Sequence, residues 1–464
     1  MKSENGLGSI LKSMMIDTVP AYANKLYYSL GFLSATSFVI LLLSGITLIA
    51  RGPVWWLTTS FGIYVRSVHL WATQAFVLFM VIHLLIVFFT YAYRKPRQIT
   101  WVLGGIMLFV ALFEAEFGYL LRGDFSSQWR GLQASDLYNG SGLGAYINNL
   151  NFTQIYGIHT VILPFLIIAI LLLHYTLVRK LGIATPHRTD IHHTVVKANH
   201  TVLFMRGVVA VIVILLLAAA FKSPIIDPVT VQSVANSDSG LMAQTLLVEM
   251  DGSSDTATYM DHIDPYTYNL RDVYIFNPYQ QATVLDQSGS TNWASVFQSE
   301  PTTTQDEQVK AAEDYFTNGG AITTSEVQLN PVIPLISKLV VMGQSGLYED
   351  SLREQASQGY NPTYATRFLA DTGVLEAQAT SLGITTDQYG MMREETGHLP
   401  GAWWLLPVGL LDHTVLANDA NQDQHGAEIL GLLILLFLAF PYIPILNRIP
   451  DKLSIYKLIW KEKK

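Results

Sequence analysis

Apolar residues gather into six stretches that are each long enough to cross a bilayer, whose hydrocarbon core of about 30 Å needs about 20 helical residues. The six stretches are residues 27–49, 65–93, 101–121, 154–179, 203–221 and 427–446. The long polar segment 223–400 contains no run of that length. The pattern predicts an all-α integral membrane protein with six transmembrane helices and one inserted soluble domain of mixed or unknown fold.

The same pattern divides the chain into four parts. In chain order they are an amphipathic lead-in at 1–26, five spans at 27–222, the inserted domain at 223–400, and the last span with a basic tail at 401–464. Short apolar or β-branched runs at 272–276, 331–342 and 364–370 suggest mixed secondary structure in the insert. The insert contains no phosphate loop, no metal-spaced histidine cluster and no nucleophile motif.

Two of the predicted spans carry paired histidines, His69 with His83 and His159 with His174. A step of 14 residues returns to within about 40° of the same helix face and climbs about 21 Å, whereas a step of 15 misses by about 60°. Each helix therefore offers one imidazole near each leaflet. Histidines within a membrane are costly and face the bundle interior. A lone histidine is explained by a hydrogen bond to a neighbouring helix, but four in matched pairs predict bis-histidine ligation of two haem irons stacked across the membrane.

Two further spans carry glycines with the same spacing of 14, Gly31 with Gly45 and Gly104 with Gly118. Single glycines in membrane helices are explained by close helix contacts. Glycines that repeat the histidine spacing predict instead that a porphyrin lies flat against the helix backbone at the same two depths.

Composition limits the kind of haem and the orientation of the chain. The sequence has no cysteine, which excludes disulfides, thiolate-ligated clusters and covalent c-type haem, so any haem in this chain is held non-covalently. The segments on the side of the termini hold 17 of the 28 basic residues. The positive-inside rule then places both termini in the cytoplasm and the insert outside. The membrane that we expect is the cytoplasmic (inner) membrane.

This orientation sets the depth of each pair. His69 then pairs with His159 near the outer face, and His83 with His174 near the inner face. Arg66 lies one turn before His69 and can reach a propionate of the outer haem, the alternative being a snorkelling anchor.

Two carboxyl residues lie inside the third predicted span, Glu114 and Glu116. They are either proton-relay groups or residues that face a polar cavity.

These residues resemble the cytochrome b family of Rieske/cytochrome b complexes, including its cytochrome b6 type, over about residues 18–222 and more weakly over 399–450. The matching residues are Ile158, His159, Pro164, His174, Gly182 and Pro186 in the family's fourth helix, and Gly118, Tyr119 and Trp129 at the start of its outer quinol-site loop. The resemblance implies a dihaem four-helix bundle, a quinone site at each side, and electron transfer between the leaflets.

The sequence departs from the family at the outer quinol site. The family's Pro-Glu-Trp-Tyr motif, whose glutamate accepts a quinol proton, corresponds here to Gly401-Ala402-Trp403-Trp404, so the carboxylate is missing. Trp403 and Trp404 remain candidates for the outer quinone site. Nearby substitutes for the carboxylate are Glu394, Glu395 and His398.

The inner quinone site needs cytoplasmic proton donors, since quinone reduction there consumes protons. His187 is the first candidate, followed by His192, His193 and Lys197. The alternative for these residues is a basic loop that faces anionic lipid.

The leading hypothesis is a dihaem cytochrome b subunit of a quinol:electron-acceptor oxidoreductase complex, which carries electrons between the quinone pool and partner redox subunits. The expected partners are membrane lipid, quinone and a Rieske iron–sulfur protein, c-type cytochrome or molybdenum enzyme outside. Relatives suggest a homodimer, and no nucleic acid is expected. Residues 229–400 hold 22 acidic and 6 basic residues, which favours a basic partner face or serves solubility alone.

Two other functions remain open. One is a haem b membrane anchor and electron wire for an extracytoplasmic oxidoreductase, which uses only the inner quinone site. The other is a non-redox receptor or channel whose histidines are structural or line an ion path.

Overall fold

The computed structural model describes residues 16–185, 193–260, 269–285, 291–318, 330–356, 361–384 and 401–460. Within this part, six helical segments are long and apolar enough to cross a membrane. They are Leu30–Arg51, Ser60–Phe89, Gln98–Leu120, Phe152–Leu181, His200–Ala220 and Gln424–Tyr442. The prediction of an all-α, six-span membrane protein is confirmed.

The spans are built from the following helices. They are α2 (Leu30–Arg51), α4 (Ser60–Phe89), α5 (Gln98–Leu120), α7 (Phe152–Gly157) with the π turn η4 (Ile158–Ile162) and α8 (Leu163–Leu181), α9 (His200–Ala220) and α22 (Gln422–Ala439). Helix α4 begins five residues before the predicted position 65 because Thr59 caps it, its side chain accepting a hydrogen bond from the backbone N–H of Gly62.

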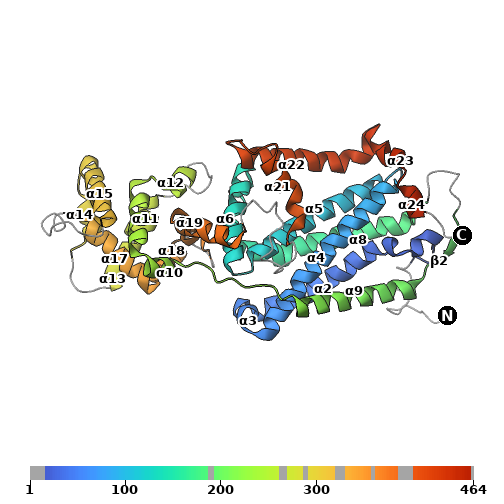
Figure 1. Cartoon of the computed structure of the whole chain (residues 1–464), viewed down its shortest axis with the longest axis horizontal. Coiled ribbons are helices and arrows are strands. Elements are labelled where there is room, and N and C mark those ends of the chain that lie inside the picture. The colour runs from blue at the N-terminus through green and yellow to red at the C-terminus, as the bar shows by residue number, and fades with distance from the viewer. Residues whose placement is uncertain are drawn as a thin grey trace, which may run out of the picture.

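Helices α2, α4, α5 and α8 pack as a bundle, with α9 against α2 and α4 and α22 against α5. Figure 1 shows the insert at one end of this bundle, and β2 and α24 at the opposite end. There, β1 (Thr18–Pro20) pairs antiparallel with β2 (Val195–Lys197), with Val19 opposite Val196. The shorter bundle elements are η1 (Ala21–Asn24), η2 (Leu26–Tyr28), α3 (Pro53–Thr58), α6 (Phe125–Gly140), η3 (Leu143–Ala145), η7 (Trp403–Leu405), α21 (Leu406–His413), η8 (Phe440–Tyr442), η9 (Leu446–Arg448), α23 (Ile449–Leu453) and α24 (Tyr456–Trp460).

The described part of the insert is helical, which corrects the expectation of mixed secondary structure. Its elements are α10 (Val231–Ser237), α11 (Ser239–Asp251), α12 (Asp255–Met260), η5 (Asp272–Phe276), α13 (Asn277–Leu285), α14 (Trp293–Gln298), α15 (Thr302–Thr317), α17 (Val332–Ser345), α18 (Leu347–Gln355), α19 (Thr363–Asp371) and α20 (Val374–Leu382). The apolar run at 331–342 forms α17, which buries Val332, Ile336 and Leu339 at helical spacing.

Helix α6 joins the insert to the bundle. It follows α5 in the chain, yet its Phe125 and Trp129 belong to the hydrophobic core of the insert. The indole of Trp129 donates a hydrogen bond of 3.2 Å to the carbonyl of Ile384 near the far end of the insert. The insert therefore rests on a platform supplied by the segment between the third and fourth spans.

Candidate cofactor-binding site

The bundle brings His69 of α4 and His159 of η4 opposite each other at its insert end. Their ring centroids lie 6.3 Å apart and their planes are inclined by 75°. The Nδ1 of His69 lies 2.9 Å from the hydroxyl of Ser44, and the Nδ1 of His159 lies 3.0 Å from the carbonyl of Glu114. Because each Nδ1 has a partner within the protein, the Nε2 of each ring is the nitrogen left for a metal.

A π turn corrects the spacing of the second pair. His159 lies in η4, which ends two residues before Pro164, a residue that cannot donate the backbone hydrogen bond of a regular α-helix. A π turn takes in about one more residue than an α-helical turn. The 15 residues from His159 to His174 therefore behave much like a step of 14, and both helices present their histidines at matching depths.

Each pair lines a separate cavity. The insert-side cavity, of about 1320 Å³ with its open part included, is lined by His69, His159, Gly45 and Gly118 among others. The terminus-side cavity, of about 1090 Å³, is lined by His83, His174, Gly104 and Arg97 among others. Each histidine pair therefore shares its cavity with at least one glycine of the 14-residue pattern.

The four predicted glycines each face one of the four histidines. A Cβ added at Gly31 would lie 3.5 Å from His83, at Gly45 3.3 Å from His69, at Gly104 3.2 Å from His174, and at Gly118 2.9 Å from His159. Distances below 3.4 Å are tighter than ordinary van der Waals contact. A side chain at any of these four glycines would therefore crowd the neighbouring imidazole.

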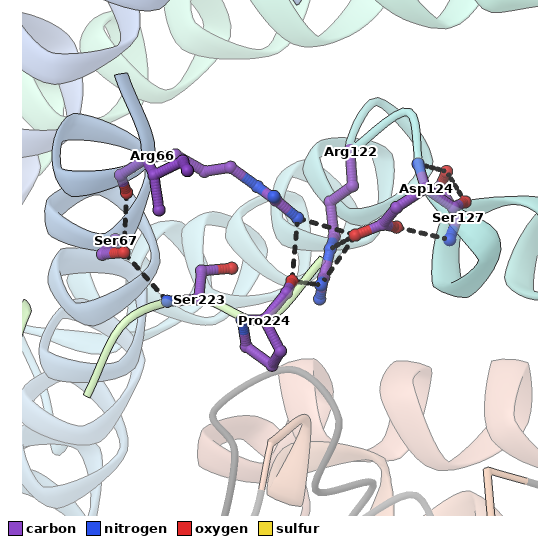
Figure 2. Close-up of polar contacts among 8 residues, drawn as sticks. Arg66, Ser67, Arg122, Asp124, Ser127, Ser223 and Pro224 are labelled. Atoms are coloured by element: carbon purple, nitrogen blue, oxygen red, sulfur yellow. Dashed lines mark hydrogen bonds and ion pairs between the residues drawn. The ribbon is translucent and has the colours of Figure 1, made fainter. Parts of the chain in front are cut away.

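Arg66 also lines the insert-side cavity, but its neighbours were not predicted. Its Nη2 lies 2.7 Å from Asp124 Oδ2, and Arg122 Nη2 lies 3.0 Å from the same oxygen. Both guanidinium groups also donate to the carbonyl of Pro224, where the insert begins (Figure 2). Arg122 and Asp124 follow the third span in sequence, and only their proximity to Gly118 could have drawn attention to them.

The two glutamates of α5 have different partners. Glu114 lines the insert-side cavity, and its Oε1 lies 3.2 Å from Nδ1 of His159. Glu116 lies 3.6 Å from a guanidinium nitrogen of Arg130. In the structure, Glu114 is the carboxyl that contacts a histidine of the site.

The tryptophans proposed for the outer quinone site lie beside the insert-side cavity. Trp403 donates a hydrogen bond of 3.1 Å to the side-chain oxygen of Gln74 on α4. Trp404 stacks on Tyr119, which lines the cavity, with centroids 6.3 Å apart. The segment that corresponds to the family's glutamate motif is therefore seated between α4 and α5.

The remaining quinone-site candidates are only partly described. His187, His192, Glu394, Glu395 and His398 lie outside the described residues. His193 lies at the terminus end, where its ring centroid is 6.4 Å from that of Tyr22. Lys197 is the last residue of β2.

Together these features define a class of protein, the multi-pass helical membrane proteins that carry paired histidines at two depths of one bundle. The family model described as cytochrome b (N-terminal)/b6/petB matches residues 74–233. The chain is 30% identical to cytochrome b6 of Heliobacterium modesticaldum over 203 residues, which are 39% of this chain and 95% of that protein. It is 31% identical to cytochrome b6 of Mastigocladus laminosus, over 36% of this chain and 88% of that protein.

The chain belongs to the cytochrome b family. It is a multi-pass membrane protein of electron transport, and the family implies haem b. A solved structure titled hyperthermophilic respiratory Complex III aligns over 96% of this chain and 98% of its own, with a TM-score of 0.41 and 14% identity. The family model covers His83, His159 and His174 of the bundle, whereas most of the insert lies beyond its matched residues.

Proposed function

We propose that this chain is a dihaem cytochrome b subunit that carries electrons across the membrane between a quinol/quinone pool and partner redox subunits. His69 and His159 hold one b haem, and His83 and His174 hold the other. The observation that carries this proposal is the repetition of one arrangement at both ends of a single bundle: two histidines line one cavity, and a glycine lies beside each.

The residues between the two cavities suit transfer from one haem to the other. A buried apolar cluster contains Phe38, Phe76, Met80 and Leu108. Phe38 and Phe76 line the insert-side cavity, whereas Met80 and Leu108 line the terminus-side cavity. This thin layer excludes water from the space between the haems, while the haems themselves supply the redox chemistry.

Orientation and partners complete the proposal. The basic segments put both termini in the cytoplasm and the insert outside, in the cytoplasmic (inner) membrane. Quinol oxidation at the insert side, near Trp403 and Trp404, delivers electrons inward, and His187 serves quinone at the other side. The insert docks a Rieske protein, a c-type cytochrome or another exported redox subunit, and the complex is a homodimer.

A second candidate is a haem b anchor and electron wire for an extracytoplasmic oxidoreductase that uses only the inner quinone site. The contacts of the 401–405 segment favour this candidate. The family's motif carries a carboxylate in this segment, whereas here the segment bonds the neutral amide of Gln74. Gln74 donates a hydrogen bond of 3.1 Å to the carbonyl of Gly401 and accepts one from Trp403. A neutral amide cannot accept a quinol proton as a carboxylate does.

A potentiometric titration of the purified chain, followed by reduced-minus-oxidised absorbance, tests the proposal. We expect two b-haem waves, one lost in His69→Ala and the other in His83→Ala. A single wave, or none, would contradict paired-histidine ligation. Inhibitors of the outer quinol site then separate the two candidates. They should stop turnover of the quinol-oxidising subunit and leave turnover of the haem b anchor unchanged.

A further inference from the structure

The mouth of the insert-side cavity holds more buried positive charge than the protein neutralises. Arg66 and Arg122 are each 7% exposed and share one carboxylate, that of Asp124. Glu114, the other carboxyl that lines this cavity, is turned to His159. Two guanidinium groups thus face a single negative charge within the described residues.

Each of these arginines also has a nitrogen left over. The Nη1 atoms of Arg66 and Arg122 are buried and have no hydrogen-bond partner within the described part of the chain. Both residues line the cavity that contains His69 and His159. A buried guanidinium that lacks partners is costly, and a carboxylate matches its planar array of donors through two parallel hydrogen bonds.

The same arginines hold the start of the insert. Arg122 Nη2 donates to the carbonyl of Pro224 at 2.8 Å and Arg66 Nη2 at 3.3 Å (Figure 2). Next to it, the backbone N–H of Ser223 donates to the hydroxyl of Ser67 on α4 at 2.9 Å. Any group that fixes the two guanidiniums therefore also fixes the first residues of the insert.

We propose that Arg66 and Arg122 form a two-armed clamp for a carboxylate of the cofactor in the insert-side cavity, a haem propionate, and that occupation of the clamp anchors the insert to the bundle. The inference rests on the proposed function. It adds Arg122 as a second propionate-binding residue and couples haem binding to the seating of residues 223–229.

The redox arm of the test compares Arg122→Gln, Arg122→Lys and Arg51→Gln in the full chain. Arg51 lies at the same end of the bundle but is exposed and does not line the cavity, so Arg51→Gln controls for the loss of one charge. Ferric haem is one charge more positive than ferrous haem, so removal of a nearby cation favours the ferric state. Arg122→Gln should therefore shift the insert-side wave downward by at least a tenfold change in the ferric/ferrous equilibrium, about 59 mV for one electron.

Arg122→Lys, which keeps the charge but not the planar fork, should shift that wave less. Arg51→Gln should leave both waves in place. The terminus-side haem in the same molecule reports whether a variant has folded. If Arg122→Gln loses both haems, the shift of the insert-side wave in Arg122→Lys decides whether the clamp exists. Equal shifts of the two waves, or an unchanged insert-side wave, would overturn the clamp.

The anchoring arm measures hydrogen exchange of residues 223–229 in haem-replete and haem-depleted chain. The amide of Ser223 and that of Val229, which donates 3.1 Å to Gln128, should exchange more slowly with haem bound. Arg122→Gln should abolish this difference. Identical exchange with and without haem in the unaltered chain would overturn the coupling. Absence of any haem wave would instead refute the proposed function, whereas two waves that ignore Arg122→Gln refute the clamp alone.

Discussion

Replacement of Glu114 by glutamine should raise the midpoint potential of the insert-side haem. The carboxyl oxygen of Glu114 lies 3.2 Å from Nδ1 of His159, and the two side chains are only 18% and 17% exposed. The Nδ1 of His159 lies near both the Glu114 carbonyl, at 3.0 Å, and this carboxylate. A carboxylate that shares the N–H makes the imidazole a stronger donor and stabilises the ferric state, whose charge is more positive. Glutamine keeps the size and the acceptor but removes the charge.

The size of the shift follows from the strength of the contact. A hydrogen bond to a charged group contributes about 1.5–3 kcal/mol and a neutral one about 0.5–1.5 kcal/mol, so the variant loses about 1 kcal/mol. Since about 1.4 kcal/mol corresponds to about 59 mV for one electron, we expect a rise of about 40 mV.

The assay is the same two-haem redox titration, with Glu116→Gln as the matched control. Glu116 lies two residues further along α5 and pairs with Arg130 rather than with a histidine. The wave assigned through His69→Ala should move in Glu114→Gln, and the other wave should stay. A midpoint that stays in place, or that moves as far in Glu116→Gln, would show that the contact with His159 does not set the potential.

Two further predictions concern packing and pH. Gly118→Ala should reduce occupancy of the insert-side haem more than Gly31→Ala reduces occupancy of the terminus-side haem. The reason is that the added Cβ lies 2.9 Å from His159 at Gly118 but 3.5 Å from His83 at Gly31. The haem-to-protein ratio of each variant measures the occupancy, and equal losses would contradict the prediction. In the insert, burial and the neighbouring Asp371 raise the pKa of Glu249 well above its usual range. The folded insert then keeps a proton that the unfolded chain releases above about pH 4.3, so its stability should fall by about 1.4 kcal/mol per pH unit from about pH 5 upward. Glu249→Gln should flatten this dependence in urea denaturation followed by pulse proteolysis of the insert, and an unchanged slope would show that this carboxyl is not its source.

The arrangement of the bundle could be predicted because it depends on the spacing of residues along single helices. A 14-residue period fixes both the depth and the face of a residue on a helix, so the positions of His69, His83, Gly31 and Gly45 followed from helix geometry alone. The π turn at His159 could not be predicted with the same certainty. Pro164 marks a break in the backbone hydrogen bonds, but it does not say whether the helix kinks, ends or widens there.

The contacts between the insert and the bundle were beyond sequence reasoning. Trp129 belongs to the insert core through a partner 255 residues away, and no local pattern signals such a pairing. The helical nature of the insert was signalled more directly. Thr230 and Ser233 form a capping box before α10, and the side chain of Asp238 caps α11. These caps start short helices, whose few turns are too brief to show a clear hydrophobic period.

The position of the insert explains how the bundle tolerates it. The chain enters the insert beside Ser67, which accepts a hydrogen bond from the Ser223 amide, and leaves it beside Gln74, which bonds the carbonyl of Gly401. Ser67 and Gln74 are seven residues apart on α4, about 10.5 Å along the helix axis. Insertions are accommodated where their two ends lie close together at a surface. Both ends of the insert are therefore fixed to α4, the helix that carries His69.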